Sequence, residues 1–128
     1  MQNAQPTEEV FYQGARTYHG ADVVRVDLNK SDPLRWRLDL QNHSPTGFEW
    51  SYGGSGPSQL ALALLADATG NDESALRFYQ DFKWDVVARL PYEGWRLPLS
   101  EVKEWVQLQE GGVAGEWQDT NSEVKEVL

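Results

Sequence analysis

The chain has 128 residues, a formal net charge of −9 and no cysteine. This length predicts one domain with its own core, and the absence of cysteine excludes disulfides, cysteine-based zinc sites and a thiol nucleophile. Because an acidic surface repels phosphate backbones, nonspecific nucleic-acid binding is not expected, whereas a basic protein partner, mimicry of nucleic acid or a role in solubility alone all fit.

We expect no export signal in the first residues and no membrane span in the chain. Residues 1–9 lack a basic region followed by an apolar one, so they do not resemble a signal peptide, and we expect a flexible arm. The longest apolar run, residues 60–66, is far shorter than a membrane span. We therefore expect a cytoplasmic protein without a membrane partner.

Four segments of the first half predict strands. Residues 10–16 are rich in aromatic and β-branched side chains, and residues 23–28 alternate between apolar and polar. Residues 35–41 alternate again, and residues 48–52 place three aromatic side chains on one face. Strands with one apolar and one wet face are typical of an antiparallel sheet.

The second half predicts three helices. Residues 59–68 are rich in Ala and Leu on nearly every side, which indicates a buried helix. Residues 72–90 carry apolar side chains at three- and four-residue spacing, and a proline follows them. After a connector over residues 92–98, a third helix capped by Ser100 includes residues 103–109.

The order of these elements predicts an α+β fold. A three- to four-stranded antiparallel sheet from the N-terminal half would pack on about three helices from the C-terminal half. We expect a flexible arm over residues 1–9, a single domain over residues 10–110 and an acidic mobile tail over residues 111–128. An open edge of the sheet could pair two copies, so a homodimer is a further expectation.

A glycine-rich turn precedes the first predicted helix. Backbone N–H groups at a helix N-terminus can hold an anion, but the lysine of a phosphate-binding loop is absent, and Pro57 breaks a Gly-x-Ser-x-Gly nucleophile motif. The glycines could instead serve only a tight turn over a crowded aromatic layer. If the turn binds a ligand, the candidate contacts are Gly53, Gly54, Ser55, Gly56, Trp50 and Tyr52.

Catalytic, metal and cofactor signals are weak, and we predict none of these sites. The two histidines, His19 and His43, have no second ligand at helical spacing. Asp81 and Asp85 lie one turn apart on a helix but are expected to form a solvated face. An enzyme would require Ser55 to lie beside one of the histidines.

Two groups of side chains are candidates for contacting a protein partner. One is a basic patch expected on the wet face of the sheet, opposite Val24 and Val26. The other is a set of tryptophans placed off the apolar stripes, and tryptophan is enriched at interfaces. Together these candidates are Arg25, Arg35, Arg37, Trp84, Trp95 and Trp117.

Three segments give the chain a family resemblance. They are residues 52–61, Tyr-Gly-Gly-Ser-Gly-Pro-Ser-Gln-Leu-Ala; residues 79–84, Tyr-Gln-Asp-Phe-Lys-Trp; and residues 12–16, Tyr-x-Gly-x-Arg. In these the chain resembles an uncharacterised family of small bacterial and phage proteins, known as a domain of unknown function. The resemblance spans residues 10–110 and implies a microbial, often mobile-element, origin. It supplies no catalytic residues.

These observations lead to ranked hypotheses. The preferred one is a noncatalytic protein-interaction or regulatory module acting on a protein partner. The alternative is a small-molecule or anion-binding protein that uses the turn at residues 53–56. An enzyme using Ser55 or a carboxylate pair ranks third.

Overall fold

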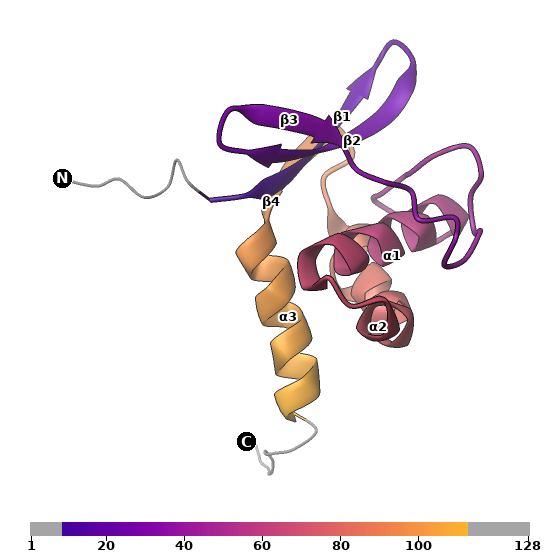
Figure 1. The fold of residues 1–128 in the computed structure, drawn as a ribbon. Coiled ribbons are helices and arrows are strands. Elements are labelled where there is room, and N and C mark those ends of the chain that lie inside the picture. The colour runs from indigo at the N-terminus through magenta and orange to yellow at the C-terminus, as the bar shows by residue number, and fades with distance from the viewer. Residues whose placement is uncertain (1–8, 113–128) are drawn as a thin grey trace, which may run out of the picture.

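A computed structural model describes residues 9–112 and has an α+β fold. Its elements are β1 (Phe11–Thr17), β2 (Gly20–Asp27), β3 (Lys30–Pro33), α1 (Ser55–Thr69), α2 (Asp72–Asp85), the 3₁₀ helix η2 (Val87–Arg89), β4 (Gly94–Pro98) and α3 (Leu99–Gly112). One antiparallel sheet has the strand order β3-β2-β1-β4. Figure 1 shows it above α1 and α2, with α3 leading away from β4.

The predicted fold class, an antiparallel sheet packed on three helices, is confirmed. None of the helices in residues 9–112 is long and apolar enough to cross a membrane. Most of the predicted arm and tail, residues 1–8 and 113–128, lies outside the described residues.

The fourth strand comes from residues that were predicted to form a connector. β4 pairs with β1, and Trp95 and Leu97 are buried while Arg96 between them is exposed. This alternation is visible in the sequence, but the neighbouring glycine and prolines favour a loop. Because β4 is an edge strand, Pro98 at its end is tolerated, and the connector prediction is wrong.

The predicted faces of β2 are inverted. Val23 is buried, whereas Val24 and Val26 are only half-buried. Arg25 points towards α1, where its Nε lies 2.8 Å from Oδ2 of Asp67. A one-residue shift of a strand moves every side chain to the other face. The partner carboxylate on α1 lets an arginine lie on the helix-facing side, and no apolar pattern reveals such a partner.

Residues 34–54 are irregular, and the strand predicted over residues 35–41 is absent from them. The pairing of β3 with β2 ends at Pro33, so no ladder continues into this segment. Arg37 then adopts a φ of 59°, which breaks an extended conformation. The alternating sequence therefore has no strand to pair with.

The strand predicted over residues 48–52 is also absent, although its burial pattern is partly correct. Phe48 and Trp50 are buried as the alternation indicates, while Tyr52 is exposed. The backbone here joins the helical layer instead of the sheet, because the N–H of Ser51 donates to the carbonyl of Val87. The alternating pattern therefore predicted that Phe48 and Trp50 point inward, but not that the backbone bonds to the helical layer.

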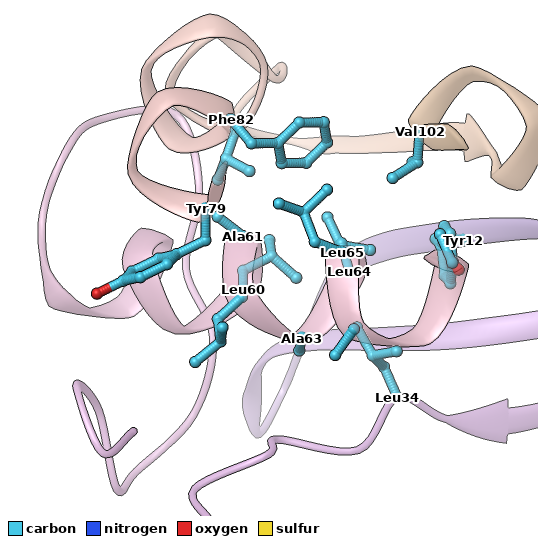
Figure 2. Close-up of a cluster of buried hydrophobic side chains, with 14 of the residues drawn as sticks. Tyr12, Leu34, Leu60, Ala61, Ala63, Leu64, Leu65, Tyr79, Phe82 and Val102 are labelled. Carbon is cyan, nitrogen blue, oxygen red and sulfur yellow. The ribbon is translucent and has the colours of Figure 1, made fainter. Parts of the chain in front are cut away.

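Helix α1 lies at the centre of the core. Every residue from position 56 to position 66 is buried, which confirms the helix predicted to be apolar on nearly every side. Figure 2 shows Leu60, Leu64 and Leu65 of α1 among side chains from the sheet and from both other helices. These surrounding side chains include Tyr12, Tyr79, Phe82 and Val102.

The other helices differ from their predicted bounds by several residues. α2 ends at Asp85, and η2 replaces the last turn that was predicted up to residue 90. α3 begins one residue before Ser100, whose hydroxyl bonds to the Glu9 carboxylate. A cap therefore was not needed to start α3, which follows directly from β4.

Candidate binding site at the glycine turn

Two exposed aromatic rings cover the glycine turn. A Cβ atom at Gly53 would lie 2.1 Å from Cη2 of Trp84, and one at Gly54 would lie 2.7 Å from the Tyr52 ring. Trp84 is 57% exposed and Tyr52 is 52% exposed. A side chain at either glycine would therefore displace one of these rings, and the packing displays two aromatic side chains on the surface.

The side chain of Glu49 packs against the start of α1. Gly54 is the N-cap of α1 and no side chain caps the first turn. A Cβ at Gly56 would lie 2.8 Å from Cβ of Glu49, so Glu49 packs directly against this turn. A negative group is favoured at a helix N-terminus. Glu49 adds negative charge close to the turn, which repels a second anion, so the geometry weighs against the anion-binding interpretation of the turn.

Arg16 of β1 holds Glu49 in place. Its Nη2 and Nη1 atoms donate to the two carboxylate oxygens at 2.9 and 3.2 Å. These hydrogen bonds raise the pKa of the Arg16 guanidinium above its usual value, although partial burial opposes the shift. The guanidinium lies 3.7 Å from the ring centroid of Tyr92 and 4.7 Å from that of Trp50. The pair is therefore fixed by aromatic faces as well as by its own hydrogen bonds.

Trp50 packs beneath the site, against the Arg16 guanidinium, and is not exposed at the surface. It is fully buried, and its Nε1 donates to the carbonyl of Tyr92 at 3.0 Å. A ligand at the surface cannot touch a fully buried ring. Trp50 therefore has no exposed surface for a ligand in this structure, and its predicted contact with a ligand stays a prediction.

An open pocket of about 830 Å³ lies between the β1–β2 hairpin, the irregular segment and the start of α1. Its volume is in the range of small-ligand pockets. Trp36 and Tyr52 contribute aromatic surface, and Asp22 and Glu49 contribute carboxylates. Ser55 and Gly56 of the turn line it as well, but no Lys or Arg of the described residues does. This lining suits a basic or neutral aromatic group better than an anion.

A buried glutamine holds the pocket wall against α1. Gln59 accepts from the backbone N–H groups of His43 and Ser44 at 2.7 and 3.1 Å, and it donates to the carbonyl of Trp36 at 2.7 Å. Gln59 was not among the predicted site residues. Gln59 is a lone amide at the start of an otherwise apolar helix. Because a buried amide needs hydrogen-bond partners, this position could have indicated a contact with another segment.

The three candidate arginines do not form one patch. Arg25 shares Asp67 with the buried Tyr12, whose hydroxyl donates to the same carboxylate oxygen at 2.7 Å. Burial raises the pKa of Tyr12, and the hydrogen bond to Asp67 adds to the effect. Burial alone would lower the pKa of Arg25, but Asp67 outweighs it and the net shift is upward. Arg25 is thus a structural link between sheet and α1.

Arg37 is also paired with carboxylates, so that of the three candidate arginines Arg35 alone is exposed. Arg37 donates to Asp39 and to Asp72 at the start of α2, both at 3.0 Å, and these hydrogen bonds raise its pKa. Arg35 lies on the same irregular segment and is exposed. The predicted basic sheet face is therefore wrong, because two of its arginines pair with carboxylates that belong to helices or to the segment itself.

Of the two candidate tryptophans within residues 9–112, Trp84 alone is placed where a partner could reach it. Trp95 lies in β4, is buried and stands edge-on to Trp50 with ring centroids 5.5 Å apart. Its ring fills the space above Gly14, where a Cβ would lie 2.3 Å away. The prediction of an exposed Trp95 is wrong, since its apparent loop is a strand. Trp117 lies outside the described residues.

The residues considered for catalysis are not assembled for it. His19 and Ser55 line the same pocket, but no hydrogen bond joins them in the described part of the chain. His43 Nε2 instead lies 2.7 Å from the Tyr79 hydroxyl. Asp85 accepts from Trp105, and Asp81 is exposed. Within residues 9–112, no group of three His, Asp or Glu side chains is placed to hold a metal ion.

Comparison with known proteins adds two findings. A family model described as "Family of unknown function (DUF6166)" matches residues 12–108. The chain is also 36% identical over 103 residues to "tRNA pseudouridine synthase D" of Pseudomonas syringae pv. tomato, an alignment that covers 79% of this chain and 26% of that protein. This chain therefore spans about a quarter of that relative's length. No solved structure matches it.

Proposed function

We propose that this chain, which belongs to the family of unknown function DUF6166, is a noncatalytic module whose glycine-turn pocket receives a basic side chain of a protein partner. The observation that carries the proposal is the lining of the 830 Å³ pocket, which combines aromatic surface and carboxylates with no described Lys or Arg. A guanidinium or ammonium group can use both kinds of wall at once.

The partner contacts two places on the chain. These are the pocket and the exposed ring of Trp84 over Gly53. Trp36, Tyr52 and Asp22 line the pocket. Asp22 accepts a hydrogen bond from the neutral hydroxyl of Thr17 and has no cationic partner in the described residues, while Glu49 remains tied to Arg16. A single exposed cation–π contact contributes only about 0.5–1 kcal/mol. An isolated basic side chain therefore binds weakly. The partner gains further affinity by packing on Trp84, whose exposed ring covers Gly53 of the turn, since exposed tryptophans are common anchors of interfaces.

The charge of the chain and its similarity to a longer protein fit a module of this kind. With a net charge of −9, the chain attracts a basic partner over long range. The similar region makes up 26% of a protein named as a tRNA pseudouridine synthase. Such partial coverage is what we expect of a module that can be joined to other parts. The acidic pocket lining gives no support for RNA as the ligand here.

The test is an NMR titration of the full chain with two short peptides that differ only in charge. We expect Ac-Gly-Arg-Gly-NH₂ to shift the backbone amide signals of Ser55 and Gly56 and the Trp36 indole signal. Ac-Gly-Glu-Gly-NH₂ should leave them unchanged. Shifts produced by the glutamate peptide alone would favour the anion-binding alternative, and no shift with either peptide would contradict the proposal.

A further inference from the structure

A second surface, separate from the glycine turn, lies between α2 and α3. It is a groove of about 360 Å³ whose apolar lining includes Phe82, Val86, Leu97 and Leu108. Leu108 is 65% exposed, so its side chain is available at the mouth of the groove. Nothing in the described chain covers it.

One wall of the groove is held rigidly. Trp105 of α3 stands edge-on to Phe82 with ring centroids 5.0 Å apart, and its Nε1 donates to Oδ2 of Asp85 at 3.1 Å. Because this hydrogen bond and this packing fix the indole, the groove is formed before any partner binds. A preformed apolar surface loses less entropy on binding than a flexible one.

The polar edge of the groove is acidic. Glu101 and Glu104 of α3 line it, and Asp85 of α2 lies against the adjacent Trp105. No Lys or Arg of the described residues lines the groove, and neither glutamate forms an ion pair within residues 9–112. An occupant therefore needs an apolar face between basic side chains.

We infer that this groove docks an amphipathic basic helix of a protein partner. Residues 113–128 are a poor alternative occupant, because they hold four acidic residues, Glu116, Asp119, Glu123 and Glu126, and one lysine, Lys125. A second copy is equally disfavoured, because it would bring a net charge of −9 against the same carboxylates. A helix with leucine anchors and lysine flanks matches both the apolar lining and the edge.

The experiment uses the full chain and a fluorescent peptide of about 18 residues, built of Leu and Lys in an amphipathic helical pattern. Fluorescence anisotropy measures its dissociation constant. We expect Leu108→Ser to weaken binding about tenfold or more. Leu76→Ser, which removes a 41% exposed leucine elsewhere on α2, should leave it unchanged. Thermal unfolding of both variants should match the unsubstituted chain, since both side chains are on the surface.

Charge reversal separates docking from general attraction between opposite charges. The double variant Glu101→Lys/Glu104→Lys should weaken peptide binding far more than Asp32→Lys/Glu73→Lys, which changes the net charge equally at exposed positions outside the groove lining. Equal losses in the two double variants would overturn the inference.

Two further results would also overturn it. A gain of about fivefold or more in peptide affinity on Trp117→Ala would show that the chain's own C-terminal residues occupy the groove. A dimer that Leu108→Ser dissociates, seen by sedimentation, would make a second copy the occupant. Since the glycine-turn pocket shares no lining residue with the groove, either surface can fail without the other.

Discussion

The glycine-turn pocket and the α2–α3 groove differ in whether their polar side chains already have partners within the described chain. At the pocket, Glu49 is bound by Arg16 and the wall is held by Gln59. At the groove, Glu101 and Glu104 form no ion pair with described residues, and the lining is mostly apolar. The pocket is thus suited to binding one side chain of a partner. The groove instead provides apolar contact area beside carboxylates that have no ion-pair partner in the described chain.

The largest expected effect comes from removing the buried amide that holds the pocket wall. Gln59→Leu leaves three backbone groups of the irregular segment without their partner, so the free energy of unfolding should fall by about 3 kcal/mol. Urea unfolding measures this. Gln80→Leu, at an exposed position on α2, is the control and should change stability little. Equal effects of the two variants would mean that the wall does not depend on Gln59.

A methyl group at the turn should displace the aromatic ring that covers it. In Gly53→Ala the new Cβ would lie 2.1 Å from the Trp84 ring, which can swing away because it is exposed. We expect a loss of about 1 kcal/mol and a changed indole N–H signal of Trp84 in NMR spectra. Gly111→Ala meets no atom within 4 Å and should have neither effect. An unchanged Trp84 signal in Gly53→Ala would contradict the described packing.

Breaking the ion pair of the pocket should have a similar or smaller effect. Arg16→Met removes both hydrogen bonds to Glu49, and the side chains of the pair are 20% and 36% exposed. Solvent screens such a pair, so we expect a loss of about 1 kcal/mol in urea unfolding. Arg89→Met, at an exposed position without an ion pair in the described chain, serves as the control. A loss no larger than that of Arg89→Met would show that Glu49 needs no partner.

The smallest expected effect is a dependence of stability on pH through His43. Burial, with a smaller contribution from the charge of Lys83, lowers the pKa of His43 from its usual value of 6.5. The unfolded chain therefore takes up the proton first, and stability present above pH 6.5 is lost as the pH falls towards the folded-state pKa. His43→Gln should lose this dependence below about pH 6.5, whereas His19→Gln should retain it. Identical pH profiles of the two variants would contradict this assignment.

The sequence predicted the parts of the fold that depend on local periodicity. α1 is recognisable because it is apolar on every side, and its burial is confirmed. β1 and β2 were found at nearly correct bounds. The alternation of residues 35–41 and 48–52 did not become strands, because pairing requires a neighbouring strand that alternation does not supply.

The candidate site was only partly predictable for the same reason. Aromatic side chains do lie against the glycines of the turn, and Trp84 is exposed as expected, but whether the turn binds a ligand stays a prediction. Arg16, Glu49 and Gln59 were missed because their partners are distant in sequence, 33 residues apart in the pair of Arg16 with Glu49. No local pattern encodes such a contact.

The most direct test of the account compares two ligands that differ by one charge. Ac-Gly-Arg-Gly-NH₂ and the same peptide with citrulline, a neutral isostere of arginine, are titrated into the full chain and followed by the Gly56 amide signal. The account predicts clearly tighter binding of the arginine peptide, with an advantage that shrinks as salt is added. Equal affinities at low salt would contradict the claim that the pocket receives a basic side chain.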